Sequence, residues 1–341
     1  MTNENPLFTR LVRGEYSESV HRGRMVLVGP EGRLESHGDL REDILPRSSL
    51  KPLQLLPLFA SGEPERLGLS PEQQAILVAS HSGDEQHVST VRSILQKVGI
   101  PESALGCGAS EPLDREAAKR LFKSGGEPTR VHHNCSGKHS GFLIRARMLG
   151  APLEGYLDPM HPVHVEIRET INELAGTSLT AEDAVIDGCG APMYPLPLET
   201  MASLVRDLAN PERLPTRYQE AARAIFDAIN TAPHHLAGRA RIDTALLQAA
   251  PGRFLLKCGA EGYFILGVRA CEGLEAMGLA LKVDDGARRG YETFLARYLV
   301  EKGLLSGTEE SMETFFAGRI QNSQGLQVGE YRTEHESLGR I

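Results

Sequence analysis

The stretch Gly252–Ala270, "GRFLLKCGAEGYFILGVRA", carries the clearest fold signal in the sequence. Two apolar segments flank Gly-Ala-Glu-Gly, which is the pattern of two strands joined by a turn. A third strand is predicted at residues 276–283, "AMGLALKV", and a hairpin at residues 24–38, "RMVLVGPEGRLESHG". Strands are therefore expected at both ends of the chain.

The residues between these strands show helical periodicity. Residues 70–73, Ser-Pro-Glu-Gln, are typical of a helix start, with an N-cap serine, a proline in the first turn and a capping-box glutamine. Apolar residues at helical spacing predict helices at about residues 71–79, 88–98, 137–149, 163–174, 198–209, 215–230 and 287–303.

Strands at the chain ends with helices between them predict an α+β fold. We expect one unit over residues 1–341, with a mainly antiparallel sheet built from about 1–45 and 250–341 and a helical part at about 46–249. A doubly wound parallel sheet is the alternative. Regular β-α alternation and a phosphate-type glycine loop, which that fold needs, are missing from the sequence.

The composition excludes several classes of function. The net charge is -8 with scattered Lys and Arg, so neither nucleic acid nor an anionic membrane surface is an expected partner. No apolar run approaches the roughly 18 residues of a membrane-spanning helix, and the start lacks the apolar core of a signal peptide. Five widely spaced cysteines indicate reduced thiols or metal ligands. We expect a cytoplasmic enzyme acting on a small molecule.

Ser48 and Lys51, in "RSSLKPLQLLPLF" (residues 47–59), are candidates for nucleophilic chemistry. Their i, i+3 spacing places both side chains on one face of a helical turn. A lysine made neutral by burial can take the proton of a serine hydroxyl. Pro52 disfavours helical torsions at Lys51, so the pair is tolerable only in a first turn. An N-cap serine followed by a solvated lysine is the common alternative for this spacing.

Two further motifs could complete such a site. Lys257-Cys258-Gly259 ends a predicted strand and resembles the K-T-G triplet that edges the pocket of S-x-x-K serine enzymes. The alternative is a strand-terminal lysine before a turn. Residues 79–83, "ASHSG", place Ser80 and His81 either in a site-lining loop or at a helix C-terminus capped by Gly83.

Two cysteines near glycines suggest a metal. Cys135 lies in "HHNCSGKHSG" and Cys189 in "DGCGAP". Thiolate and imidazole are usual zinc ligands, so on chemistry alone the favoured set is Cys135, His139 and Cys189, which leaves one position open. Two buried free thiols are the alternative.

Six motifs in one order resemble the rhizobial-type (type III) L-asparaginases. They are "RSSLKP" at residues 47–52, "ASHSG" at 79–83, "NCSGKH" at 134–139, "DGCGAP" at 187–192, "GRARIDT" at 238–244 and "KCGAEG" at 257–262. The similarity spans roughly residues 8–285. It implies a fold like that of serine β-lactamases and glutaminases, a homodimer, and hydrolysis of L-asparagine to aspartate and ammonia.

The resemblance also implies site residues. Ser48 with Lys51 would form one Ser-Lys tandem and Ser80 with Lys257 another, and which serine is acylated stays open. One Zn²⁺ per chain would be bound by Cys135, Lys138 and Cys189, with Lys138 in place of His139. The candidate substrate-binding residues are Arg47, His81, Asn134, His139, Asp187 and Gly259.

In the expected mechanism Ser48 attacks the side-chain amide, Lys51 takes the proton, and water then cleaves the aspartyl ester. Backbone amides near Ser48 and Gly259 are candidate oxyanion donors. Two other functions fit part of the pattern: a β-lactamase-like or peptidase serine hydrolase, and a non-catalytic zinc-binding protein in which the two cysteines tie loops together.

Overall fold

A computed structural model describes residues 4–333. Its main sheet is fully antiparallel, with the strand order β6-β7-β8-β2-β1-β10-β9 and β3 paired to β2. The strands are β1 (Leu7–Arg13), β2 (Tyr16–Gly29), β3 (Gly32–His37), β6 (Phe254–Cys258), β7 (Tyr263–Val268), β8 (Met277–Val283), β9 (Arg319–Gln321) and β10 (Gln327–Thr333). The predicted α+β fold is confirmed, and the doubly wound alternative is wrong.

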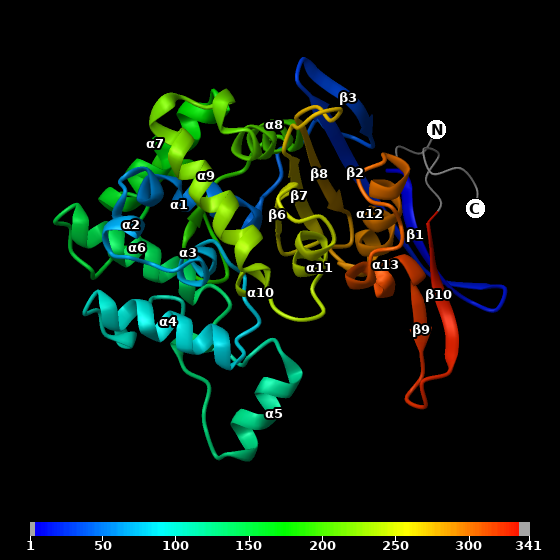
Figure 1. Cartoon of the computed structure of the whole chain (residues 1–341), viewed down its shortest axis with the longest axis horizontal. Helices are drawn as coiled ribbons and strands as arrows, with labels where there is room; N and C mark the ends of the chain where they lie inside the picture. Colours follow the sequence, from blue (N-terminus) through cyan, green and yellow to red (C-terminus); the bar gives the residue numbers. More distant parts are fainter. Residues whose placement is uncertain (1–3, 334–341) are drawn as a thin grey trace.

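The sheet joins the two ends of the chain. β2 pairs with β8 from Gly23–Val283 to Val28–Gly278, and β1 pairs with β10. Figure 1 shows these early (blue) and late (gold to red) segments side by side. The expected sheet-forming parts include residues 1–3 and 334–341, which lie outside the described residues.

Thirteen α-helices occur in the described residues, most of them in the central part (Figure 1). They are α1 (Lys51–Ala60), α2 (Glu63–Arg66), α3 (Pro71–Leu77), α4 (Glu85–Lys97), α5 (Arg115–Lys123), α6 (Ser136–Met148), α7 (Pro162–Ala175), α8 (Leu198–Ala209), α9 (Thr216–Thr231), α10 (Pro233–Leu236), α11 (Ile242–Ala249), α12 (Arg289–Glu301) and α13 (Glu313–Ala317). The predicted helices and the Ser70–Gln73 capping box are confirmed. α2, α5, α10, α11 and α13 lie outside the predicted ranges.

Helices cover both faces of the sheet. Gly267 and Gly278 lie opposite each other in β7 and β8, and a Cβ on either would overlap a backbone carbonyl of α8. Val283, five positions after Gly278, faces Gly290 of α12. Because side chains alternate along a strand, α8 and α12 pack on opposite faces.

The contact of α8 with the sheet predicts a large stability effect. Gly278→Val would drive a branched side chain into the Ala202 carbonyl, so we expect a loss of about 3 kcal/mol in the free energy of unfolding. Urea denaturation followed by circular dichroism measures it. Met277→Val, at the neighbouring and partly exposed position, is the control and should change stability by less than about 1.5 kcal/mol. Equal losses for the two variants would contradict this account of the packing.

Candidate functional site

A short 3-10 helix, Arg47–Leu50, leads directly into α1 and places the first candidate pair. Lys51 has helical torsions (φ -56°, ψ -40°) although Pro52 follows it, and Pro52 lies in the first turn as the sequence required. Lys51 is fully buried, whereas Ser48 is only half-buried. Ser48 makes no side-chain hydrogen bond within residues 4–333, so its hydroxyl is available to a ligand.

The Lys51 amine donates hydrogen bonds to two groups at the end of α3. One acceptor is the Ala79 carbonyl, and the other is the Ser80 hydroxyl at 2.9 Å. A backbone hydrogen bond fixes the Ser80 loop, because the Ser80 amide donates to the Leu236 carbonyl at 3.0 Å. The observed lysine–serine contact is thus Lys51 to Ser80, formed by residues 29 positions apart.

Burial controls the charge of Lys51. Burial is the largest cause that lowers the pKa of the amine, the charges of Lys138 and Lys257 also lower it, and Cys135 opposes them. Together these effects lower the pKa of Lys51 from its ordinary 10.5 to about 8. A neutral amine has two N–H groups and one lone pair. Ala79 and Ser80 accept the two N–H groups, so the lone pair is left to take a proton.

Lys257 enters from the edge strand β6. Its amine is fully buried, donates to the Cys258 carbonyl at 3.0 Å and lies 3.9 Å from the Asp243 carboxylate. A Cβ on Gly259 would come within 2.7 Å of the Pro46 carbonyl, which shows how closely the end of β6 approaches the Ser48 turn. No hydrogen bond joins Lys257 to Ser80 among the described residues.

Asp243 lies in the motif "GRARIDT" (residues 238–244), and the sequence predicted no role for it. It is fully buried, and its carboxylate accepts the Cys258 amide at 2.9 Å. Burial alone would raise the pKa of Asp243, but the charges of Lys257 and Arg241 lower it below its ordinary value. Asp243 is therefore the acidic partner of Lys257 inside the protein.

Arg47 and Asp187 meet across the site. Their side chains form an ion pair at 2.6 Å, and Asp187 also accepts the Gly188 amide at 2.8 Å. Arg47 has a φ of 51°, in the left-handed region that non-glycine residues rarely adopt. The structure thus brings the DGCG loop, with Cys189, next to the Ser48 turn.

The other expected substrate-binding residues differ in whether their polar groups are free to bind a ligand. His81 uses both ring nitrogens internally, with Ser136 at 2.8 Å and the Gly83 amide at 3.2 Å. The Gly259 amide donates to the Tyr263 carbonyl at 2.7 Å, so it is not the oxyanion donor that the sequence suggested. The Asn134 side-chain amide makes no hydrogen bond within residues 4–333, and this half-buried group is available to a ligand.

His139 contacts Tyr156. Its Nδ1 contacts the Tyr156 hydroxyl at 2.5 Å, and since that hydroxyl already accepts the Gly106 amide, it donates its own proton to His139. The Nε2 of His139 then carries a hydrogen, is buried and has no partner among the described residues. His139 keeps one free donor for a ligand.

The Lys138 amine contacts a cysteine sulfur, whereas the His139 ring contacts Tyr156. The Lys138 amine lies 3.1 Å from the Cys189 sulfur, and a hydrogen bond from Cys189 lowers the pKa of the Cys135 thiol well below its usual value. Burial lowers the pKa of Lys138, but Cys189, Cys135 and Asp187 together raise it above its ordinary value. Within residues 4–333, the ligand atoms of Cys135, His139 and Cys189 do not form a group within 4.8 Å of one another. Thiolates are usual ligands of Zn²⁺, and an amine can join them only after the metal displaces its proton.

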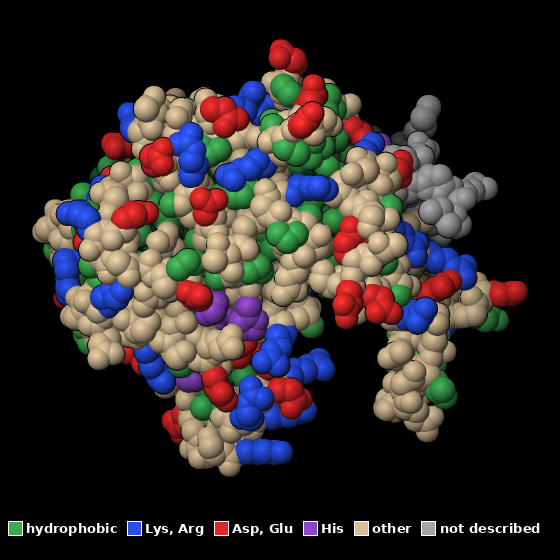
Figure 2. Space-filling model, viewed as in Figure 1, with side chains coloured by type: hydrophobic (Ala, Val, Ile, Leu, Met, Phe, Trp, Pro, Cys, Tyr) green, Lys and Arg blue, Asp and Glu red, His purple; other side chains and the backbone are tan. Residues whose placement is uncertain are grey.

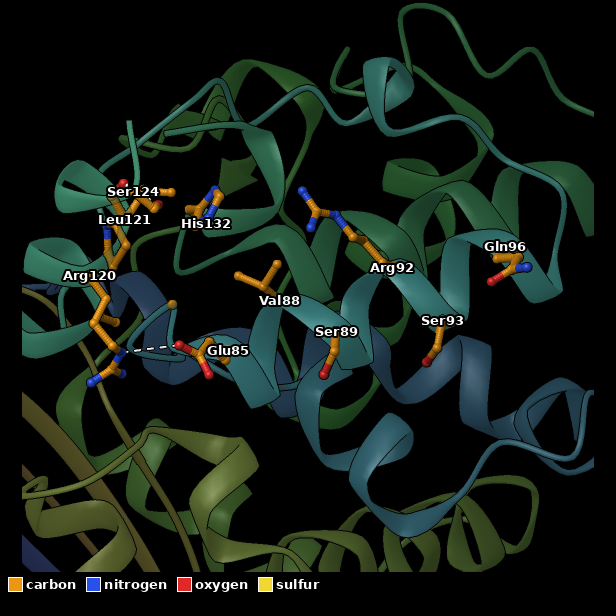
Figure 3. Close-up of a pocket in the computed structure, with 13 residues that line it drawn as sticks. Glu85, Val88, Ser89, Arg92, Ser93, Gln96, Arg120, Leu121, Ser124 and His132 are labelled. Carbon is orange, nitrogen blue, oxygen red and sulfur yellow. Dashed lines mark hydrogen bonds and ion pairs between the residues drawn. The ribbon is translucent and has the colours of Figure 1, made fainter. Parts of the chain in front are cut away.

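A surface cavity of about 600 Å³ lies elsewhere, between α4 and α5 (Figure 3). Arg92, Ser89 and Ser93 line it from α4, and an ion pair between Glu85 and Arg120 crosses it. None of the candidate site residues lines this cavity. The candidate site is instead the buried cluster around Lys51.

The fold and this cluster define an α+β protein with a buried lysine–serine contact, Lys51 to Ser80, at the junction of its sheet and helices. Residues 9–333 match the model of the L-asparaginase II family. The chain therefore belongs to the L-asparaginase II family and is an amidohydrolase. Comparison with curated protein sequences gives no match.

Similar solved structures include glutaminases and a β-lactamase, the two kinds of protein that the resemblance implied. A probable glutaminase from Bacillus subtilis complexed with 6-diazo-5-oxo-L-norleucine has 13% identity and a TM-score of 0.40, over 83% of this chain and 85% of the other. A β-lactamase from Mycobacterium bovis has 17% identity and a TM-score of 0.39, over 83% and 95%. These similarities are too remote to indicate an activity.

None of the helices in the described part of the chain combines the length and apolar character that crossing a membrane requires.

Proposed function

We propose that the protein hydrolyses the side-chain amide of L-asparagine, giving L-aspartate and ammonia through an acyl-enzyme on Ser48. The observation that carries the proposal is the buried Lys51 amine, which has both N–H groups engaged and its lone pair left over. Ser48 lies three residues earlier, is half-buried and has a free hydroxyl. A hydroxyl of this kind becomes a nucleophile when a neighbouring base takes its proton.

The steps follow from these positions. Lys51 takes the Ser48 proton as the oxygen attacks the amide carbon, and the C–N bond breaks as ammonia leaves. Ser80, hydrogen-bonded to Lys51, passes that proton to the departing nitrogen. A water molecule then attacks the aspartyl ester, gives its proton back through Lys51, and frees Ser48.

Lys257 acts by its charge. It is buried beside Asp243 and close enough to Lys51 to lower the pKa of that amine. A fixed positive charge there favours the neutral form of Lys51 and stabilises negative charge that develops on the substrate oxygen. Arg47 and the free donors of Asn134 and His139 are proposed to bind the polar end of the substrate.

Zinc, when bound by Cys135, Lys138 and Cys189, would supply a Lewis-acidic position for the polar end of asparagine. The nucleophile already has a base in Lys51, so the metal is proposed to aid binding rather than to activate Ser48. The homodimer and the cytoplasmic location stay predictions.

The metal assignment predicts which variants lose zinc. Lys138→Ala is expected to lose most of the bound metal, because the amine lies 3.1 Å from the Cys189 sulfur. His139→Ala is the matched control, since this neighbouring side chain contacts Tyr156 instead, and it should keep its zinc. Plasma emission spectrometry of the purified proteins gives the metal content. Full zinc in Lys138→Ala with loss in His139→Ala would contradict the assignment.

The pKa of Lys51 predicts a pH profile. Only the neutral amine can accept a proton, so kcat/KM for asparagine should rise about tenfold per pH unit below about 8 and level off above it. Initial rates between pH 6 and 9.5 measure this, with circular dichroism at each pH to show that the chain stays folded. A profile that is flat or falls over this range would count against a lysine base.

Ammonia release from asparagine and from glutamine tests the substrate. We expect kcat/KM for asparagine to exceed that for glutamine. A higher value for glutamine would overturn the proposed substrate but leave the amidohydrolase class intact, whereas release from neither would overturn the proposal as a whole.

A further inference from the structure

A second group of ligand-type side chains lies beside the Ser80 loop. Asp84, His87 and His234 bring one carboxylate and two imidazole nitrogens within 4.8 Å of one another. Asp84 contacts His87 Nδ1 with one oxygen and His234 Nε2 with the other, each at 2.8 Å. Asp84 and His87 are buried, and 22% of the His234 side chain is exposed.

The tautomer of His87 indicates that a cation binds in this cluster. His87 Nε2 contacts the backbone carbonyl of His234 at 2.9 Å, and because a carbonyl can only accept, Nε2 carries the hydrogen. In the neutral ring Nδ1 then presents a lone pair, yet it lies 2.8 Å from an oxygen of Asp84. Two acceptors at that distance repel each other unless a cation lies between or beside them.

The geometry at His87 Nδ1 argues against a proton on this nitrogen as the cation. Within residues 4–333 this buried nitrogen has no hydrogen-bond partner, because its direction does not meet the Asp84 oxygen despite the short distance. A protonated His87 would therefore leave an N–H pointing past the carboxylate. A metal-binding histidine usually donates its other ring nitrogen to a backbone carbonyl or a carboxylate. His87 matches this pattern, since its Nε2 donates to the His234 carbonyl and its Nδ1 has no hydrogen-bond partner within residues 4–333.

We propose that Asp84, His87 and His234 form a second metal site, which binds a divalent transition-metal ion such as Zn²⁺. Two imidazole nitrogens and one carboxylate oxygen suit Zn²⁺ and its neighbours in the first transition series far better than Ca²⁺ or Mg²⁺. Three protein ligands would leave a fourth position for water. The site contains no cysteine and is separate from the Cys135–Lys138–Cys189 set.

The ion can reach the site from solvent. His234 is partly exposed, and Figure 2 shows histidine side chains (purple) at the surface of this face of the molecule. His235, the next residue, contacts Thr90 at 3.3 Å and is not one of the converging ligands. Variants of His234 and His235 can therefore be compared, because His234 is a proposed ligand and His235 is an adjacent residue that is not.

The position of the site gives it a structural role in catalysis. Asp84 caps α4 and follows Ser80 by four residues, while His234 precedes Leu236, whose carbonyl accepts the Ser80 amide. Ser82 is also tied to this second segment, through the Ala237 carbonyl at 2.6 Å. A metal ion held by Asp84, His87 and His234 would clamp these two segments together and fix Ser80 against Lys51, so the three ligands are positioning residues.

Cobalt binding tests the site without reference to activity. The full chain is freed of metal with a chelator and titrated with Co²⁺, with bound metal measured by equilibrium dialysis and cobalt–thiolate bands by absorption. We expect His234→Asn to bind one equivalent of Co²⁺ fewer per chain than wild type, and His235→Asn to bind as much as wild type. The lost equivalent should carry no thiolate band, because its ligands are nitrogen and oxygen.

Two further variants keep the outcome independent of the proposed zinc site. Asp84→Asn retains an oxygen to cap α4 but loses the charge, and should also lose one equivalent. The double variant Cys135→Ser/Cys189→Ser should still bind one equivalent, and saturating Co²⁺ should raise its melting temperature. Unchanged binding in His234→Asn and Asp84→Asn, or no binding in the double cysteine variant, would overturn the proposal and leave the cluster as hydrogen bonds alone.

Discussion

Replacing Ser48 with Ala is expected to lower kcat/KM for asparagine by about 10⁴-fold, or roughly 5.5 kcal/mol in the activation barrier. The variant loses the only atom that is proposed to bond to the substrate carbon. Its fold should be unchanged, because the Ser48 hydroxyl makes no hydrogen bond within the described residues and is only half-buried. Steady-state ammonia release measures the effect.

The neighbouring serine provides the control for this variant. Ser49 is fully buried, and its hydroxyl donates to the Pro46 carbonyl at 2.7 Å. Ser49→Ala should therefore cost some stability but leave kcat/KM within about tenfold of wild type, which is about 1.4 kcal/mol. If Ser48→Ala is the variant that stays within this range, Ser80 becomes the nucleophile, since it is the hydroxyl that contacts Lys51.

Lys51→Met is expected to lower kcat/KM by about 10³-fold or more. Methionine fills a similar volume but has no amine, so Ser48 loses its base and Ser80 loses its partner. Residues that act as a unit are non-additive, so the double variant with Ser48→Ala should be no slower than Ser48→Ala alone.

A second lysine tests whether the effect is specific. Lys282 is partly buried in β8 and donates to the Val283 carbonyl. Lys282→Met should retain wild-type kcat/KM, because this lysine contacts none of the candidate site residues in the part of the chain that the structure describes. A loss below tenfold in Lys51→Met, or additive losses in the double variant, would exclude Lys51 as the base.

The sheet was predictable where the strands are apolar. The strands β6, β7 and β8 are almost entirely buried, so their composition alone indicates strands. β2 was recognised only in its buried second half, because the first half is polar and exposed. β10 was missed for a related reason: it is mostly half-exposed, and its partner β1 lies at the other end of the chain.

The candidate metal ligands show what spacing can and cannot decide. Lys138 and His139 stand three and four residues after Cys135, and both spacings bring a side chain near it on a helix. The deciding contacts are with Cys189 and Tyr156, which are distant in sequence. The resemblance to a family predicts Lys138 as the third zinc ligand, whereas the usual chemistry of zinc predicts His139.

Other parts of the site could not be inferred from the motifs that contain them. The contact of Lys51 with Ser80 depends on how α1 packs beside the end of α3. His87 and His234 are 147 residues apart, and His234 stood in the sequence without any accompanying signal. The free Gly259 amide expected from the motif is instead used in the hairpin between β6 and β7.

Covalent labelling tests the central claim most directly. An asparagine analogue with a diazoketone in place of the side-chain amide should alkylate the nucleophile, and mass spectrometry of peptides from the labelled protein locates the adduct. We predict that the label is on Ser48, that it requires Lys51, and that excess asparagine prevents it. A label on Ser80, or labelling of the Ser48→Ala variant at the wild-type rate, would contradict the proposed role of Ser48.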